Sequence, residues 1–375
     1  MNYKLYRRLH CQAAIASTLL LFTSLSYANT STTQENGAST QQGEQSHFQS
    51  IIDHVPNFID ATPTILPPES NQVLVPSTSQ TQENTWADQQ QNQIHNWIDR
   101  SAMKIDQWFG QPDPERPADA SLRLIIDQSY NQHDQYEFKP RIRGKIKLPA
   151  LENKLSVVFG DDTLDNEFDH NVAIVNQNPD YAVNKQFDKK QSWEDNSSIA
   201  LRWSEISKKL PFKFDADLGL RSGDDLYLRF KAKRDWPLKN DFFIHAEQIY
   251  RYGSKSENFL RTNLELTHAR PQQAFVSNQL SLTYADKQED DLSWDNRLFR
   301  QHQFFENNRF SYGIYSGGFY DQSDLRLDSW GPFVSWRQPI GREWLFIQAD
   351  LNYFNQHRDH RDHYLSSLIR FEALF

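Results

Sequence analysis

Cysteine and long apolar runs are scarce in this chain of 375 residues, and each scarcity excludes a class of protein. The single cysteine, Cys11, precedes an apolar stretch near the N-terminus, so it cannot serve as a lipid acceptor following that stretch. Downstream of it the chain can form no disulfide, thiolate metal site or thiol nucleophile. Mean hydropathy is −0.77, and no segment supplies the ~20 apolar residues of a membrane-spanning helix.

Residues 1–28 read as a cleaved secretory signal peptide. Lys4, Arg7 and Arg8 form a basic region, residues 13–22 are apolar, and residues 26–28 form a small-x-small cleavage site. The apolar region is too short to span a bilayer as a helix. We therefore expect the chain to be exported.

Residues 29–84 are rich in Ser, Thr, Gln, Asn and Pro, which predicts a disordered polar periplasmic segment. Residues 85–110 follow with helical spacing of apolar side chains. The predicted apolar face consists of Ile94, Trp97, Ile98, Ile105, Trp108 and Phe109. This amphipathic helix could dock on the periplasmic rim of a membrane domain, lie in the interface of the inner leaflet, plug the lumen, or bind a separate periplasmic partner.

From residue 121 to residue 375 the pattern changes to a period of two, which is typical of β-strands. In the segment 136–148, aromatic and aliphatic residues alternate with Lys and Arg. A Lys or Arg in the middle of the hydrocarbon costs ~2–4 kcal/mol, so these charges must face an interior. Abundant aromatics (13%) in a polar chain fit a barrel with a wet lumen and aromatic girdles.

We count about fourteen strands and predict an all-β, antiparallel transmembrane β-barrel preceded by the periplasmic helix. Twelve strands is the alternative, because segments 291–303 and 325–337 alternate poorly. An even number places both ends of the barrel in the periplasm. The segments after the third, seventh and thirteenth strands are expected to be longer, polar outer loops.

Two basic rows are predicted to line the lumen. They consist of Lys139, Arg141, Arg143, Lys145 and Lys147 on one strand and Arg229, Lys231 and Lys233 on another. Such a wall would attract anions, since charged side chains that line a pore bias permeation. The alternative is an internal lattice of ion pairs with acidic residues such as Asp217 and Glu247, and the two interpretations can coexist.

Two polar segments are candidate cation sites. His357, His360 and His363 recur at three-residue spacing and could bind a metal weakly, although a hydrated hairpin tip is the alternative. The segment 161–196 begins with several acidic residues but lacks the glycine of a calcium-binding loop. We expect it to cap or fold into the mouth of the barrel.

Motifs for catalysis and for nucleic-acid binding are not recognisable. Scattered serines and histidines lie outside any nucleophile motif, and no phosphate-binding or dinucleotide-binding loop is present. The chain carries a formal net charge of −9, which disfavours nucleic acid. We predict that the protein is not an enzyme and needs no cofactor.

The final segment, Tyr364 to Phe375, alternates apolar and polar side chains. With the strand pattern of residues 121–375, it resembles the outer-membrane β-barrel proteins of Gram-negative bacteria, in an uncharacterised porin-like subfamily. The resemblance implies location in the cell outer membrane, contact with lipid and lipopolysaccharide, and Phe375 as the signal presented to the barrel-assembly machinery. It implies no particular activity.

Three functions remain open from the sequence. The first is a passive, porin-like channel whose basic wall favours anionic solutes. The second is a non-conducting structural or adaptor barrel with a partner-binding periplasmic helix. The third and weakest is a lipid-modifying enzyme of the outer membrane.

Overall fold

The computed structural model describes residues 86–109, 120–148, 155–165, 196–205, 212–269, 274–287, 292–304, 308–321 and 324–375. All of them belong to one compact unit, Val55–Phe375. The predicted signal peptide and the polar segment 29–84 lie outside the described residues.

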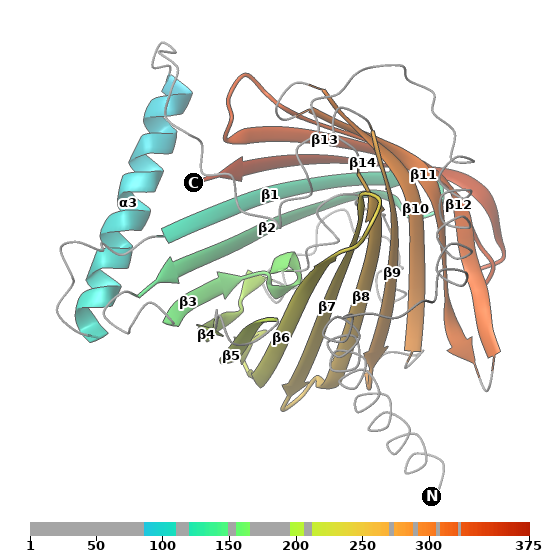
Figure 1. Ribbon diagram of the computed structural model, residues 1–375. Coiled ribbons are helices and arrows are strands. Elements are labelled where there is room, and N and C mark those ends of the chain that lie inside the picture. Colours follow the sequence, from blue (N-terminus) through green and yellow to red (C-terminus); the bar gives the residue numbers. More distant parts are fainter. Residues whose placement is uncertain are drawn as a thin grey trace, which may run out of the picture. The chain divides into compact units, whose positions relative to one another are not determined.

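The described residues form fourteen antiparallel strands that close into one barrel, in which β1 pairs with β14 (Figure 1). The prediction of fourteen strands is confirmed and the alternative of twelve is wrong, because both doubtful segments form strands. The strands are β1 (Ala120–Asn131), β2 (Gln135–Lys147), β3 (Leu155–Gly160), β4 (Ile199–Glu205), β5 (Lys213–Arg221), β6 (Asp225–Pro237), β7 (Phe242–Gly253), β8 (Glu257–His268), β9 (Phe275–Ala285), β10 (Leu292–Phe304), β11 (Asn308–Asp321), β12 (Asp324–Pro339), β13 (Leu345–Gln356) and β14 (Arg361–Leu374).

Outward-facing strand positions form an apolar belt. The exposed aliphatic side chains of this belt include Ile126, Leu201, Leu218, Leu228, Leu264, Leu282, Ile314, Val334, Leu351, Leu365 and Ile369. Exposed aromatic side chains lie near strand ends, among them Tyr130, Tyr136, Tyr252, Tyr320, Trp203 and Trp336. Soluble proteins rarely expose apolar surface of this extent, whereas a bilayer requires it with aromatic borders. The chain is a transmembrane β-barrel of the outer-membrane type.

Described turns at both ends of the barrel are short. We call the end where β1 begins and β14 finishes the terminal end, and the opposite end the far end. Turns 254–256 and 357–360 lie at the far end, so the prediction of long loops after the seventh and thirteenth strands is wrong. Their polar residues serve tight turns instead, since Asp225 accepts the backbone N–H of Lys255 at 2.7 Å.

A β-bulge interrupts the pairing of β11 with β12. The register shifts between Gly317 and Gly318, which leaves Asp328 as an extra residue on β12. Because side chains alternate with a period of two, one extra residue exchanges the inward and outward positions. Leu327 and Trp330, three positions apart, are both exposed for this reason. The bulge explains why segment 325–337 alternates poorly.

Strand β3 is much shorter than β2, so part of one edge of β2 has no strand neighbour among the described residues. Among the described residues, β2–β3 pairing stops at Arg143 and Gly160. Beyond that point Pro140 has no N–H to donate, and its carbonyl accepts the side-chain amide of Asn196 at 3.0 Å. The same side chain accepts the N–H of Ile142 at 2.7 Å. Proline is tolerated at such an edge because no neighbouring strand requires a backbone N–H donor there.

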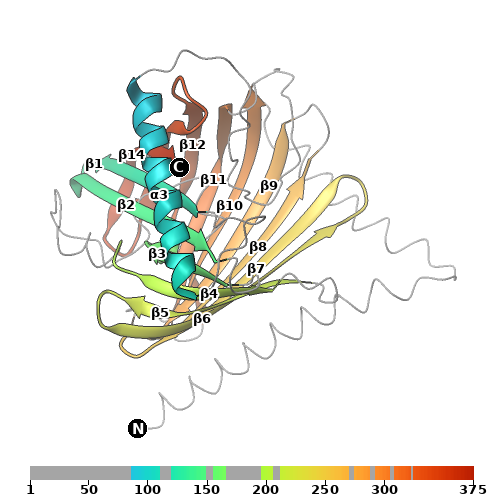
Figure 2. The same cartoon turned by 90° about the vertical axis from the view of Figure 1, so that its left-hand side faces the viewer.

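Helix α3 (Trp86–Phe109) matches the predicted helix and packs on the outside of the barrel across the terminal ends of β1 to β3 (Figures 1 and 2). Its buried residues Ile98 and Ala102 form an apolar cluster with outward-facing barrel residues. The barrel residues of this cluster are Ala120, Leu122, Ile146, Leu148, Val157, Phe159 and Phe375. These contacts place the described part of α3 against the outer wall and not in the lumen, which fits both docking on the rim and a position in the interface of the inner leaflet.

One residue of the predicted helix face is misplaced. Trp97 is 63% exposed, whereas Ile94, Ile98 and Ala102 share the packed row at i, i+4 spacing. The packed face is narrower than predicted, because adjacent residues such as Trp97 and Ile98 point about 100° apart on a helix of 3.6 residues per turn. The side chains of Ile105, Trp108 and Phe109 lie outside the described residues.

The start of α3 is held by an ion pair. Arg342, in the turn between β12 and β13, donates from Nε to Asp88 Oδ1 at 2.6 Å. No helix in the part of the chain that the structure describes is long and apolar enough to span a bilayer.

Candidate functional site

Both predicted basic rows face the lumen. On β2 the row comprises Lys139, Arg141, Arg143, Lys145 and Lys147, at positions that alternate with the outward-facing residues. On β6 the row comprises Arg229, Lys231 and Lys233, opposite inward-facing residues of β5 and β7. Arg143, Arg229 and Lys231 are buried. The structure therefore brings the rows onto one side of the lumen, formed by β2 to β7.

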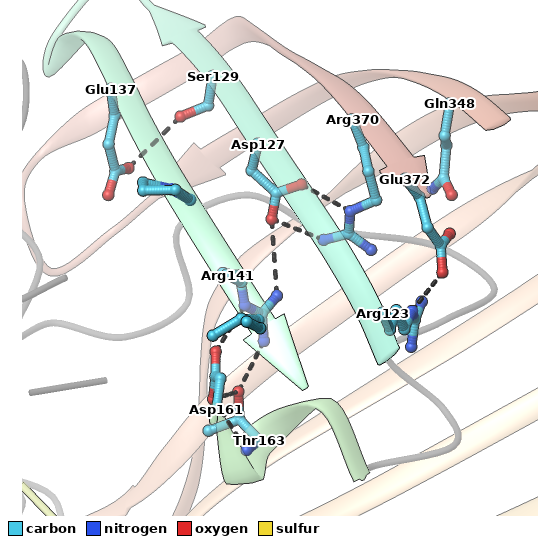
Figure 3. A network of polar contacts seen from close by, with 12 residues as sticks. Arg123, Asp127, Ser129, Glu137, Arg141, Asp161, Thr163, Gln348, Arg370 and Glu372 are labelled. Atoms are coloured by element: carbon cyan, nitrogen blue, oxygen red, sulfur yellow. Dashed lines mark hydrogen bonds and ion pairs between the residues drawn. The ribbon is translucent and has the colours of Figure 1, made fainter. Parts of the chain in front are cut away.

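An ion-pair network joins the basic row of β2 to the seam between β1 and β14 (Figure 3). Arg370 on β14 donates from Nε and Nη2 to the two carboxylate oxygens of Asp127 on β1, at 2.6 and 2.9 Å. Arg141 lies 3.6 Å from the same carboxylate. Closer to the terminal end, Glu372 pairs with Arg123 and with Arg337, the latter at 2.5 Å. The seam is bridged by charge on its lumen side.

After β3 the chain turns into the lumen. Gly160 adopts a φ of +92°, which favours glycine, and the N–H of Asp161 donates to the carbonyl of Ile142 at 2.7 Å. The short 3₁₀ helix η2 (Asp162–Asp165) follows, and Asp161 accepts the N–H of Thr163 at 3.0 Å. Leu164 is buried. The described start of segment 161–196 thus folds into the mouth of the barrel, as predicted.

Asp161 ties this inturned segment to the first basic row. Arg141 donates from Nε to Asp161 at 2.6 Å and from Nη2 to the Thr163 hydroxyl at 2.7 Å (Figure 3). Arg141 thereby connects Asp127 with Asp161. The charges alternate in sign from β14, through β1 and β2, to the inturned segment.

Asp162 lies in a cluster of arginines from three other strands. Its Oδ1 is 3.4 Å from Nε of Arg221 on β5, and its Oδ2 is 3.0 Å from Nη1 of Arg251 on β7. Arg143 and Arg229 also act on the carboxylate through their charges. We call Arg143, Arg221, Arg229 and Arg251 the arginine cluster. Four cations surround one buried carboxylate here.

Acidic residues named as possible partners in the sequence neutralise part of this wall. Asp217 accepts a bidentate pair of hydrogen bonds from Arg202, both at 2.7 Å, and lies 3.3 Å from Arg229. Glu247 pairs with Lys231 at 2.5 Å. Even so, inward-facing Lys and Arg outnumber inward-facing Asp and Glu on β2 to β7. The wall combines an ion-pair lattice with an excess of positive charge.

The ionisation of Asp162 reflects this excess. Burial by itself would raise the pKa of the carboxyl, but the charges of Arg221, Arg251, Arg229 and Arg143 outweigh burial and lower the pKa to about 2. A lowered pKa means that the contact stabilises the fold above the ordinary carboxyl pKa of 3.8 and is lost as pH falls through about 2.

We therefore expect the Asp162 carboxyl to stay ionised at pH 4. Its carbon-13 chemical shift, assigned by comparison with Asp162→Asn, should titrate with a midpoint near 2. A midpoint for Asp162 near the ordinary value would contradict the cluster's influence.

The three histidines of the last hairpin do not assemble into a metal site. No group of three or more His, Cys, Asp or Glu in the described ranges could hold a metal ion. His363 packs against Trp330 and Tyr353 instead, with ring centroids at 4.6 and 5.3 Å. His357 and His360 take part in the turn, where the N–H of His360 donates to the carbonyl of His357.

Phe375, the predicted assembly signal, follows the last strand. Its backbone exchanges hydrogen bonds with Leu122 at 2.8 and 2.9 Å, and its ring lies in the cluster beneath α3. Its role in assembly stays a prediction.

Sequence reasoning missed several members of the site. They are Arg123, Arg202, Arg221, Arg251, Arg337 and Arg370, together with Asp161 and Asp162. All the arginines lie at inward-facing strand positions. A count of charged inward positions would have found those on strands with clean alternation, but not Arg337 on β12, where the bulge exchanges the two faces. The fold of segment 161–196 into the mouth of the barrel was predicted, but the sequence does not show which side chains Asp161 and Asp162 meet there.

Comparisons with known proteins add little beyond the architecture. No family model and no curated protein matches the chain. Among solved structures, it is similar to OprB of Pseudomonas putida, with 11% identity, a TM-score of 0.40, and 69% of this chain and 92% of that chain covered. It is also similar to OccAB3 of Acinetobacter baumannii, with 9% identity, a TM-score of 0.38, and 69% and 99% covered. OmpT, an outer membrane protein of Vibrio cholerae, matches at 8% identity and a TM-score of 0.39, with 69% and 99% covered. The barrel assignment rests on the chain's own closed sheet and apolar belt.

Proposed function

We propose that the protein is a passive outer-membrane channel that favours anionic solutes. The observation that carries this proposal is the excess of positive charge on the lumen side of β2 to β7, which culminates in the arginine cluster. The whole chain carries a net charge of −9, so the positive wall is a local feature. A wall of one charge raises the local concentration of counter-ions and so biases permeation.

The proposal expects a narrow passage. Many inward-facing side chains are almost completely buried, including Glu247, Asn263 and Gln279. Small or extended anions that exchange hydration for guanidinium contacts would pass more readily than bulky ones. Export through a cleaved signal peptide and insertion by the barrel-assembly machinery belong to the same proposal.

Charge reversal on the basic wall tests the selectivity. Lys139→Glu with Arg143→Glu should lower the chloride-to-potassium permeability ratio severalfold, because two positive charges of the lumen become negative. The measurement is the reversal potential of the purified protein in planar bilayers under a KCl gradient.

The matched control reverses two exposed turn residues at the far end, Lys255→Glu with Lys287→Glu. The reversal potential of that variant should differ from the wild-type value by only a small fraction of the shift caused by Lys139→Glu with Arg143→Glu. An equal shift in both variants would mean that the overall surface charge, and not the wall, sets selectivity.

The burial of the inward-facing side chains also favours a second candidate, a non-conducting structural barrel. In that case the ion-pair lattice stabilises the barrel and α3 organises its periplasmic side. The same bilayers separate the two functions, since purified protein that folds and inserts but never opens would support the structural barrel.

A further inference from the structure

The inturned segment presents a carboxylate to the arginine cluster much as a solute would. Asp162 places its two oxygens on two different guanidinium groups, those of Arg221 and Arg251, which come from strands β5 and β7. Its side chain is only 4% exposed. The segment that carries it is anchored separately, through Asp161 to Arg141 and through the buried Leu164. The carboxylate is therefore held by a stem that does not depend on its own contacts.

The cluster has binding capacity beyond what Asp162 uses. Nε of Arg251 is buried and makes no hydrogen bond within the described part of the chain. An unsatisfied buried donor destabilises the folded state, and the cost is larger when the group is charged. A ligand with acceptor oxygens would satisfy this donor.

The chemistry of the cluster selects carboxylates. The planar guanidinium fork matches a carboxylate in geometry, and such charge-assisted hydrogen bonds are stronger than those between neutral groups. The group that occupies the cluster in this structure is itself a carboxylate.

We propose that the arginine cluster is a binding site for the carboxylate of an organic acid and that Asp162 occupies this site as a tethered competitor. A solute that enters the lumen binds by displacing the Asp162 side chain from Arg221 and Arg251. Because Asp162 is tethered, it competes at a high effective concentration, so the wild-type protein binds free carboxylates weakly. The identity of the ligand as a permeating solute rests on the proposed function, whereas the binding itself does not.

Acetate serves as the test ligand because it reproduces the end of the Asp162 side chain. Thermal unfolding of the purified barrel in detergent is followed at pH 7 while sodium acetate replaces sodium chloride at constant ionic strength. A ligand that binds the folded state raises the midpoint with its concentration, which yields an apparent Kd. Asp162→Asn should bind acetate at least tenfold more tightly than the wild type, since the competitor has lost its charge.

Two further variants decide whether the gain belongs to the cluster. The double variant Asp162→Asn with Arg251→Gln should lose the increase in acetate affinity. Asp224→Asn, in the exposed turn at the same end, should bind acetate as weakly as the wild type. Equal acetate affinity in Asp162→Asn and wild type would overturn the proposal, as would a gain that survives the loss of Arg251. If Asp162→Asn does not fold in chloride, recovery of folding in acetate supports the site. If it folds in neither salt, Arg251→Gln alone decides, because an undiminished acetate response in that variant would overturn the proposal.

This measurement is independent of conduction. Tightened acetate binding in a protein that shows no bilayer openings would preserve the carboxylate site and reject the channel. Anion-selective openings in a protein that does not bind acetate would preserve the channel and reject the carboxylate site.

Discussion

Replacing Asp127 by alanine should lower the free energy of unfolding by about 3–5 kcal/mol, the cost of breaking a buried ion pair from one side. Asp127 accepts both hydrogen bonds from Arg370, and both residues are buried, at 8% and 4% exposure. Without the carboxylate, the Arg370 guanidinium stays in the lumen wall with its main counter-charge gone. The loss falls on the β1–β14 seam, where the two ends of the sheet meet.

Urea unfolding of the purified barrel, followed by heat modifiability on gels, measures this loss. The control is Asp224→Ala, which breaks an exposed pair with Lys255 and should cost at most about 1 kcal/mol. Asp127→Leu combined with Arg370→Met should recover most of the stability, because buried pairs can be replaced by apolar residues of similar size. Equal stabilities for Asp127→Ala and Asp224→Ala would show that the seam does not depend on this pair.

Replacing Ile98 by alanine should release helix α3 from the barrel. Truncating a buried isoleucine costs about 2–5 kcal/mol, and Ile98 is 5% exposed in the cluster that joins α3 to the outer wall. Among the described side chains of α3, only Ile98 and Ala102 are both apolar and buried, so this loss is a large part of the docking energy. Trypsin cleavage at Arg100 and Lys104 should become much faster, while the barrel itself stays folded.

Trp97→Ala is the matched control, because Trp97 is the neighbouring residue and is 63% exposed. It removes a larger side chain from the same helix, yet it should leave the cleavage rate unchanged. Equal acceleration in both variants would contradict docking through Ile98, since alanine has a higher helix propensity than either residue and does not itself loosen the helix. Intact protection in Ile98→Ala would argue that the pair between Asp88 and Arg342 suffices.

The strands could be predicted because a barrel wall between lipid and a polar lumen imposes a strict alternation. Two strands departed from it for local reasons. On β12 the bulge at Asp328 exchanges the two faces. On β10 the outward-facing Asn296 is satisfied by reciprocal hydrogen bonds with Asn278 on β9, at 3.1 Å each way, so a polar residue is tolerated on the outer surface. Neither partner is apparent from the alternation of one strand.

The site was predictable only in part. Alternation placed Lys139, Arg141 and Arg229 in the lumen, since each lies on a strand with a clean period of two. It could not show that Arg221 and Arg251 meet at Asp162, because that meeting depends on the register of the four strand pairs from β3 to β7 and on a turn after Gly160. The lattice and the cluster are products of tertiary structure.

The short β3 strand has a consequence for the behaviour of the barrel among other proteins. Closure normally protects a β-barrel from pairing with foreign chains, since a closed sheet has no free edge. Where β2 extends beyond β3, one edge of β2 has no strand partner in the described structure, so closure does not protect that part of the strand. Pro140 has no N–H to donate there. The Asn196 side chain bonds the carbonyl of Pro140 and the N–H of Ile142, so neither group is open to another strand. Replacing both residues would convert this border into a template for strand addition, and the barrel would gain a tendency to aggregate without losing any of its own strands.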